Sequence, residues 1–298
     1  MPASPDPSLQ LLGVDFTSAP GRRKPITVAS GRWQRGVLQV QALRPLTDFG
    51  AFEALLQDPG PWLGAFDFPF GLPRVFVESA ALGTTLAGVV TEVQRRASTR
   101  KAWRALIDGW TAGRPAGARL PHRRTDLAMD GTRSTSPLQT RYVPVGLMFY
   151  EGLPRLLRAG LTLPGQHAGD PSRVALEAYP GWLAHQLLGR CPYKNGDSPA
   201  HRQARDALLQ ALRDGRSPLA RPVHWPCELD APLRDDAAGD HLDALLALVQ
   251  AAWASRRPGW GLPPDVDPLE GWIVSAGMPV EEARAVPGSS CGRAAAGG

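Results

Sequence analysis

The sequence predicts an α/β fold around a mixed sheet, with three antiparallel strands, then parallel strands, and helices on the flanks. Two short apolar runs, 11–16 and 62–67, have the length of buried strands, and each has an aspartate at or near its end. Two alternating segments follow the first run and indicate an antiparallel meander. A helical pattern then separates the meander from the second run, and parallel neighbouring strands require such a crossover.

Turn residues divide the first quarter of the chain into its expected elements. The run Asp58-Pro59-Gly60-Pro61 stops the first helix, and Pro69 and Pro73 break regular structure after the fourth strand. The expected order is a strand at 11–16, strands at 24–29 and 36–43 around the turn Ser30-Gly31-Arg32, a helix at 48–56 and a strand at 62–67.

A long segment follows the fourth strand. We expect it to be an insertion at about 74–170 within one domain of residues 11–285, because no low-complexity linker bounds it. Residues 1–10 and 286–298 are expected to be disordered tails. The remaining expected elements are partly helical structure at 91–110, an irregular stretch at 113–136, helices at 145–158, 181–188, 198–212 and 240–253, and a strand at 172–178.

Composition excludes several classes of protein. Hydrophobic residues make up 43% and charged residues 20%, as in ordinary globular domains. No apolar run approaches the roughly 20 residues that cross a bilayer, and the N-terminus lacks a signal-peptide pattern. Three cysteines without a Cys-x-x-Cys pair argue against disulfides and a zinc site. We expect a soluble, cytoplasmic protein with no membrane partner, and nothing indicates a protein partner.

Positive charge is concentrated in one part of the chain. The segment 91–145 contains eleven Lys or Arg residues and four acidic residues, whereas the whole chain has a formal net charge of +5. Such an excess is typical of a phosphate-rich partner, although a solvated Arg-rich surface would look the same. Within it, Arg123 and Arg124 are candidates for holding substrate phosphate, or they belong to a solvated loop.

Acidic residues fall where a metal site would need them. Asp15 and Asp67 lie at the ends of two apolar strands, and in parallel neighbours about 4.8 Å would separate their backbones. Asp240 and Asp243 share one face of the late helix. Glu177 lies in a predicted strand, where acidic residues are rare. A hard cation such as Mg²⁺ prefers carboxylate oxygens, so the set predicts a metal centre.

Ordinary structural roles would explain each of these acids taken singly. A strand-end aspartate is often a turn former or a helix cap. Asp240 suits a helix N-cap and Asp243 suits the first helical turn. Glu177 could face solvent. The metal-site prediction therefore depends on the order of the acids along the chain.

Several short motifs in that order resemble a known family. They are Gly13-Val14-Asp15-Phe16, Asp67-Phe68-Pro69, Glu177-Ala178-Tyr179-Pro180 with Tyr193-Lys194, Asp240-His241-Leu242-Asp243-Ala244, and the stretch from Asp267 to Ile273. Over about residues 11 to 275 the chain resembles the predicted nucleases of the family of unknown function numbered 429. That family is similar in turn to ribonuclease H and to Holliday-junction resolvases.

The resemblance implies a ribonuclease H-like fold and hydrolysis with two Mg²⁺ or Mn²⁺ ions. By position, Asp15 would bridge the metals, Asp67 would bind one, and Asp243 with Asp240 would complete the set. Glu177 would be a metal ligand or a nearby base. Resolvase-like enzymes tend to have Glu where this chain has Asp67.

The expected function is hydrolysis of nucleic acid or another phosphodiester, with Lys194 as a further candidate phosphate ligand or, alternatively, a surface cation. Two other readings stay open. A phosphotransferase or ATPase of the actin and sugar-kinase type also begins with an apolar strand ending in Asp, but the Gly-rich phosphate loops it needs are not evident. A non-catalytic nucleic-acid-binding or scaffold protein could keep the same fold. Serine-nucleophile chemistry finds no support, because Gly-x-Ser-x-Gly is absent.

Overall fold

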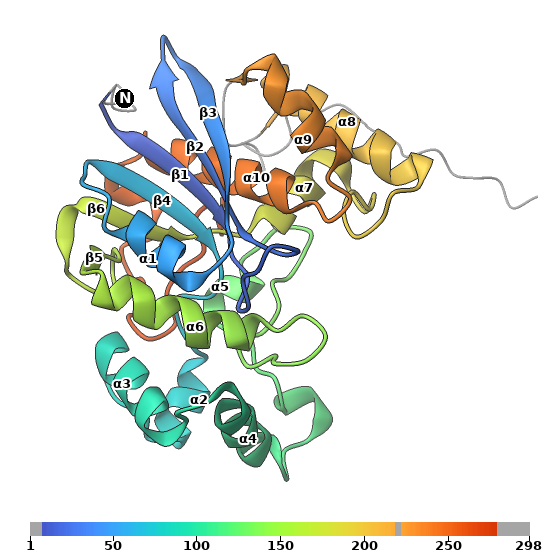
Figure 1. The fold of residues 1–298 in the computed structure, drawn as a ribbon. Coiled ribbons are helices and arrows are strands. Elements are labelled where there is room, and N and C mark those ends of the chain that lie inside the picture. Colours follow the sequence, from blue (N-terminus) through green and yellow to red (C-terminus); the bar gives the residue numbers. More distant parts are fainter. Residues whose placement is uncertain (1–7, 218–221, 279–298) are drawn as a thin grey trace, which may run out of the picture.

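The computed structural model describes residues 8–217 and 222–278. Its centre is a seven-stranded sheet in the order β5-β6-β4-β1-β2-β3-β7 (Figure 1). The strands β1 (Gln10–Asp15), β2 (Ile26–Gln34) and β3 (Val37–Leu46) are antiparallel to one another, as expected. The remaining strands, β4 (Trp62–Asp67), β5 (Leu161–Thr162), β6 (Asp170–Glu177) and β7 (Val223–His224), pair in parallel with their neighbours.

The predicted turn between β2 and β3 is wrong by several residues. Ser30-Gly31-Arg32 lies inside β2, where the pairing with β3 shifts register between Ser30 and Gly31. The chain turns instead at Arg35-Gly36, with φ of 49° and 80°. Two consecutive positive φ angles match the twist of a tight hairpin, and glycine adopts the second without strain.

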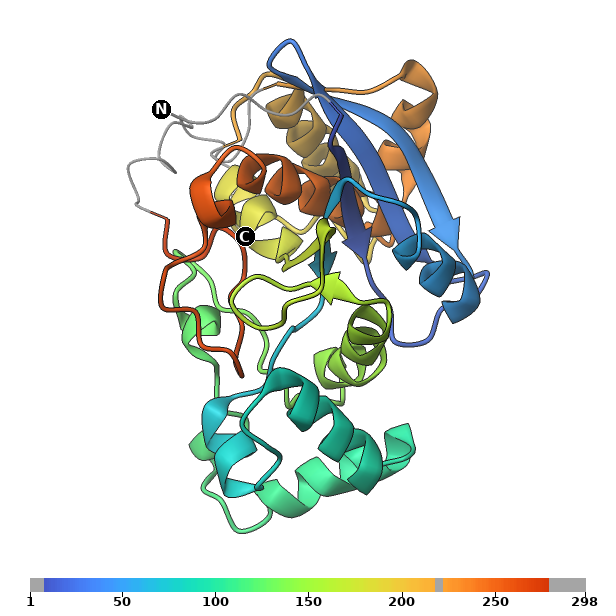
Figure 2. The ribbon, with the colours of Figure 1, turned by 90° about the vertical axis from the view of Figure 1, so that its left-hand side faces the viewer.

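Helices cover both faces of the sheet and enclose separate hydrophobic cores (Figures 1 and 2). The helices α7 (Pro180–Leu188) and α10 (Asp240–Ala254) pack on one face. The helices α1 (Phe49–Leu56) and α6 (Val145–Arg158) pack on the other. These four helices agree with the sequence prediction. Asp48 caps α1 by accepting a hydrogen bond from the Ala51 amide at 2.8 Å.

The first part of the segment between β4 and β6 extends away from the sheet, as Figures 1 and 2 show, before α6 and β5 return to it. The whole segment contains α2 (Arg74–Ser79), α3 (Leu86–Arg96), α4 (Arg100–Thr111), a 3₁₀ turn η1 (Ala116–Ala118), α5 (Arg124–Leu127) and α6. The remaining helical elements are α8 (Pro199–Arg213), η2 (Cys227–Leu229), α9 (Asp230–Asp235) and η3 (Pro258–Gly261).

The two expected tails, 1–10 and 286–298, lie almost entirely outside the described residues. Residues 286–298 lie outside the described residues, as do residues 1–7, and Gln10 already belongs to β1. Among the described residues, no helix combines the length and the apolar character needed to span a bilayer.

Candidate metal centre

Asp15 and Asp67 are direct neighbours in the sheet. They are partners in the parallel register of β1 and β4, and each is the last residue of its strand. Because side chains alternate along a strand, Asp15 shares a face with Leu11, and Asp67 shares a face with Leu63. Both leucines belong to the core under α10. The two carboxylates therefore lie on the α10 side of the sheet.

Small residues allow α10 to approach this face closely. A Cβ on Gly13 would lie 2.1 Å from the Leu248 nitrogen and 2.2 Å from the Ala244 oxygen, both in the helix backbone. A cluster of four buried alanines, Ala65, Ala178, Ala247 and Ala251, continues the contact. Direct packing of backbone on backbone fixes the first turn of α10 over the ends of β1 and β4, so Asp243 comes within reach of the two strand-end aspartates.

Asp15, Asp67 and Asp243 form one cluster. Each offers a carboxylate oxygen, and the three atoms lie within 4.8 Å of one another. Asp15 and Asp243 are buried, and Asp67 is partly exposed. In the described part of the chain, no group donates a hydrogen bond to the Asp15 or Asp67 carboxylate. Buried carboxylates without donors are costly, and a bound cation would offset that cost.

Burial and mutual repulsion favour the protonated forms of two of these acids. Burial, with repulsion from Asp243, raises the pKa of Asp67 to about 7, although Lys194 opposes the shift. Burial also raises the pKa of Asp15 well above its usual range, and the charges of Asp243 and Asp67 add to the effect. Without a metal, the cluster therefore holds more negative charge than its environment stabilises.

Asp243 differs from the other two acids because it has donors on both oxygens. The Tyr193 hydroxyl donates to Oδ1, and the Lys194 ammonium lies 2.6 Å from Oδ2. Burial disfavours the Lys194 charge, but Asp243, Asp67 and Asp15 outweigh it and raise the lysine pKa. Lys194 is thus a charged component of the cluster. The motif Tyr193-Lys194 is visible in the sequence, but the contact of Tyr193 with Asp243 depends on the fold.

Thr27 is another neighbour of the site that the sequence did not indicate. It pairs with Asp15 across β1 and β2, and its side chain is 1% exposed. Its hydroxyl has no hydrogen-bond partner among the described residues. Because an unpaired hydroxyl beside an acidic cluster is unfavourable unless something occupies the space, Thr27 adds to the fit between this site and a solvated cation.

Asp240 lies near the cluster but outside it. It occupies the first turn of α10, one turn before Asp243, and is partly exposed. Burial raises its pKa, while Lys24 lowers it. Asp240 therefore contributes to the negative field of the site from its edge.

Glu177 points away from the three aspartates. Its register partner is Phe66, which belongs to the core on the α1 and α6 side of the sheet. Strand alternation thus places Glu177 on the face opposite Asp67. Its carboxylate accepts hydrogen bonds from the Phe70 amide at 2.9 Å and from Arg123 Nη2 at 2.6 Å. Burial raises the Glu177 pKa against the effect of Arg123.

Arg123 and Arg124 have different surroundings. Arg123 is 1% exposed and is held by Asp126 and Glu177, so its guanidinium does not reach the surface where phosphate binding was expected. The side chain of Arg124 is exposed and pairs with exposed Asp265 at 2.6 Å. The sequence could not distinguish a buried arginine from an exposed one within the same basic run.

The donor set suits a hard divalent cation. Three carboxylates, one ammonium and an unpaired hydroxyl leave an excess of negative charge and of oxygen ligands, which Mg²⁺ and Mn²⁺ prefer. This buried group could hold a metal ion. No protein-family model, curated protein or solved structure matches the chain.

Proposed function

We propose that this chain is a metal-dependent phosphodiesterase that hydrolyses nucleic acid, with Mg²⁺ or Mn²⁺ held by Asp15, Asp67 and Asp243. The observation that supports the proposal is the meeting of three carboxylates from β1, β4 and α10 within 4.8 Å. Two of them have no hydrogen-bond donor in the described part of the chain. The ends of β1 and β4 form the edge of a parallel pair, where α/β proteins bind their ligands.

A bound divalent cation would supply Lewis acidity toward a phosphoryl oxygen and would lower the pKa of water. The protein's own groups have defined tasks. Asp15 and Asp67 offer oxygens on a rigid sheet, and Tyr193 and Lys194 hold Asp243 in one orientation. Lys194 also places a positive charge where a phosphate would approach. Its side chain is 38% exposed, so the ammonium is accessible from solvent.

A cleavage screen with Mn²⁺ and Mg²⁺ tests the proposal. Its substrates are labelled single-stranded DNA, duplex DNA, RNA, a branched junction and bis(p-nitrophenyl) phosphate. We expect metal-dependent cleavage by the wild type, lost by more than about 100-fold in Asp15→Asn, because even residues that merely orient metal ligands contribute about 10- to 100-fold.

The matched control is Asp240→Asn, which removes one carboxylate from the same site without touching the three-aspartate cluster. It should bind Mn²⁺ and retain most of the activity. Calorimetric titration with Mn²⁺ separates binding from turnover. A wild type that binds Mn²⁺ but cleaves none of the substrates would show that the site serves binding alone, and equal activity of Asp15→Asn would remove the metal centre from the mechanism.

A further inference from the structure

The connection between β1 and β2 ends in a tight turn of basic residues, Gly21-Arg22-Arg23-Lys24. The Gly21 amide donates to the Lys24 carbonyl at 3.1 Å, and the Lys24 amide donates to the Gly21 carbonyl at 3.2 Å. Pro20 and Pro25 flank these residues and restrict the backbone further. The turn therefore presents Arg22 and Arg23 at its tip on a defined backbone, which reduces the entropy lost when a ligand binds.

The three cations of this turn are available for a ligand. Arg22, Arg23 and Lys24 are all exposed. Within the part of the chain that the structure describes, none of their side chains forms an ion pair or a hydrogen bond. Three adjacent positive charges that form no ion pair repel one another, so a polyanion that approached them would relieve that repulsion.

Many arginines of the segment 91–145 are, by contrast, already used by the fold. Arg95 and Arg96 bind Glu92, and Arg141 binds Asp108. Arg123 is buried between Asp126 and Glu177. Composition drew attention to that segment, but several of its charges are neutralised by neighbouring carboxylates. The β1–β2 turn carries fewer positive charges, but all three of its cations are exposed and none forms an ion pair among the described residues.

The turn lies beside the candidate metal centre. The connection leaves β1 directly after Asp15, and Thr27, the register partner of Asp15, follows Lys24 by three residues. That separation is at most about 10 Å of extended chain. Lys24 also lies close enough to Asp240 to lower its pKa against the effect of burial. In Figure 1 the dark blue connection projects beyond the sheet beside the start of α10.

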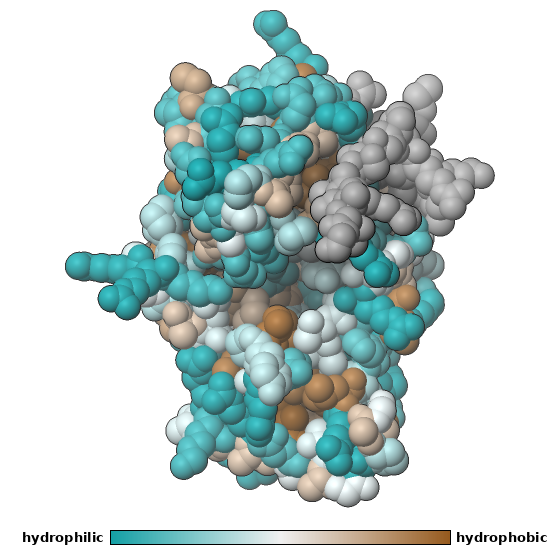
Figure 3. Space-filling model, turned by 90° about the vertical axis from the view of Figure 1, so that its right-hand side faces the viewer, coloured by the Kyte–Doolittle hydropathy of each residue, from teal (hydrophilic) through white to brown (hydrophobic). Residues whose placement is uncertain are grey.

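The anchoring of the connection keeps the turn in this place. Ser18 is buried, and its hydroxyl accepts a hydrogen bond from Arg100 Nη2 of α4 at 3.0 Å. Phe16 packs in the core between Phe52 and Phe68. Figure 3 faces the side from which the connection projects in Figure 1, and much of that surface is hydrophilic. A charged strand could therefore approach without crossing a large apolar surface.

We infer that the turn Gly21–Lys24 binds the phosphate backbone of a nucleic-acid substrate, next to the nucleotides held at the metal centre. The inference rests on the proposed function, and it implies that the substrate of the metal centre is a polynucleotide. Successive phosphates of one strand are about 3.4 Å apart along the helix axis, so a separation of at most about 10 Å spans no more than about three nucleotides. A small diester has a single phosphate, so when that phosphate is held at the metal centre none is left for the turn.

The negative field of the metal centre makes such a site useful. Asp15, Asp67, Asp243 and Asp240 repel a polyanion, whereas Arg22, Arg23 and Lys24 attract its flanking phosphates. The turn would thereby bring the strand to the centre without adding a second cation to the pocket beside Lys194.

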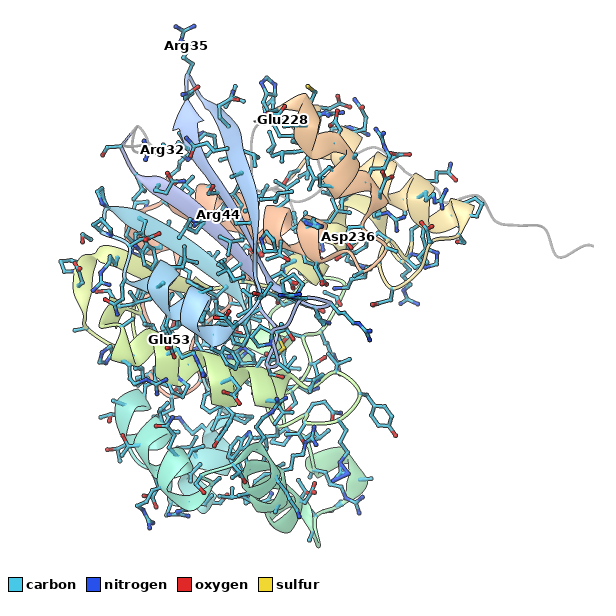
Figure 4. The ribbon with its side chains drawn as sticks, in the orientation of Figure 1. Arg32, Arg35, Arg44, Glu53, Glu228 and Asp236 are labelled. Atoms are coloured by element: carbon cyan, nitrogen blue, oxygen red, sulfur yellow. The ribbon has the colours of Figure 1, made fainter. Side chains whose placement is uncertain are left out.

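The test uses two double variants. One combines Arg22→Gln and Arg23→Gln in the turn, and the control combines Arg32→Gln and Arg35→Gln. Arg32 and Arg35 are exposed and lie at the end of β2 opposite Thr27, where Figure 4 shows them well away from Asp236, which shortly precedes the start of α10. Each double variant removes two charges. Fluorescence anisotropy of a labelled mixed-sequence oligonucleotide, measured in EDTA and in Mn²⁺ across a salt series, gives affinity and salt dependence.

We expect the Arg22 and Arg23 variant to bind at least about tenfold more weakly and to lower the slope of log affinity against log salt by about 1.4 to 1.8, because two phosphate contacts are lost. The Arg32 and Arg35 variant should match the wild type. Equal slopes in both double variants and the wild type would overturn the inference. So would a loss of binding to phosphatidylserine vesicles with no loss on the oligonucleotide.

Cleavage of bis(p-nitrophenyl) phosphate separates this inference from the proposed function. Suppose that the wild type and the turn variant hydrolyse this diester equally with Mn²⁺, and that only the turn variant binds the oligonucleotide weakly. Both the proposed function and the inference about the turn are then supported. If diester hydrolysis occurs but oligonucleotide binding ignores the turn, only the inference fails. If binding depends on the turn but no substrate is cleaved, only the proposed function fails.

Discussion

The ammonium nitrogen of Lys194 lies 2.6 Å from Oδ2 of Asp243, within a cluster of three carboxylates. The residue that the sequence offers as a phosphate ligand thus neutralises part of the cluster's charge. A divalent cation at the same place would meet the repulsion of this ammonium and would compete with it for Asp243. The charge of Lys194 therefore lowers the affinity of the cluster for metal, and it stabilises the folded protein when no metal is bound.

Replacing Lys194 with Gln should tighten Mn²⁺ binding by at least about tenfold, since a charge this close to the cation opposes it by more than about 1.4 kcal/mol at moderate dielectric. The same change should lower the melting temperature in EDTA, because the carboxylates lose their cation. Calorimetry and thermal unfolding measure the two effects. Lys24→Gln, which removes an exposed charge, serves as control and should change both much less. Weaker Mn²⁺ binding in Lys194→Gln would contradict competition between the two cations.

The stability of the metal-free protein should fall as pH rises. Burial raises the pKa of Asp67 to about 7, whereas an unfolded aspartate titrates near about 3.9. Between these values the folded state binds more protons, so the stabilisation is complete below about pH 4 and is lost as pH rises through about 7. Thermal unfolding in EDTA from about pH 5 to about pH 8 should show this decline. Mn²⁺ should reverse it, and a metal-free melting temperature that rises over this range would contradict the assigned shift.

The buried pair Arg123–Glu177 should be structural. Arg123→Met leaves Glu177 and Asp126 without their cation, and breaking a buried pair costs about 3–5 kcal/mol. We expect a fall in melting temperature of roughly 10 °C, at about 2–4 °C per kcal/mol. Adding Glu177→Gln to this variant should restore part of the loss, because one unpaired buried charge is removed.

Two controls distinguish that structural role from a part in catalysis. Arg124→Met breaks an exposed pair with Asp265 and should change the melting temperature much less. Mn²⁺ affinity of folded Arg123→Met should stay close to that of the wild type. A loss of metal binding without a loss of stability would place Glu177 and Arg123 in the metal centre after all.

Local patterns were sufficient to predict the parts of the site that lie at the ends of regular elements. Apolar runs located β1 and β4, and the helical crossover between them implied parallel pairing, so Asp15 and Asp67 became neighbours. A continuous Ala and Leu pattern located α10 and, with it, Asp243. These inferences depend only on the periods of strands and helices and on how parallel strands connect.

Side-chain direction and partners could not be predicted in the same way. Whether Glu177 faces Asp67 or the opposite side depends on the register of β6 against β4, and a shift of one residue reverses it. One of the two acidic partners of Arg123, Glu177, is 54 residues away along the chain. The contact of Tyr193 with Asp243 likewise joins distant segments. Such pairings arise from tertiary packing, so the number of charged residues in a segment does not predict them.

Gly13→Ala should displace α10 and weaken the metal centre without removing any carboxylate. The new Cβ would lie 2.1 Å from the Leu248 nitrogen, so a rigid helix backbone would have to move away from β1. Overpacking of this kind costs about 1–3 kcal/mol or more, and the shift would carry Asp243 away from Asp15. We therefore expect a lower melting temperature together with weaker Mn²⁺ binding, measured by thermal unfolding and calorimetry. The control is Gly109→Ala in α4, where a Cβ meets no atom within 4 Å and alanine favours the helix. Normal Mn²⁺ affinity in a folded Gly13→Ala protein would show that the cluster does not depend on the close contact between α10 and β1.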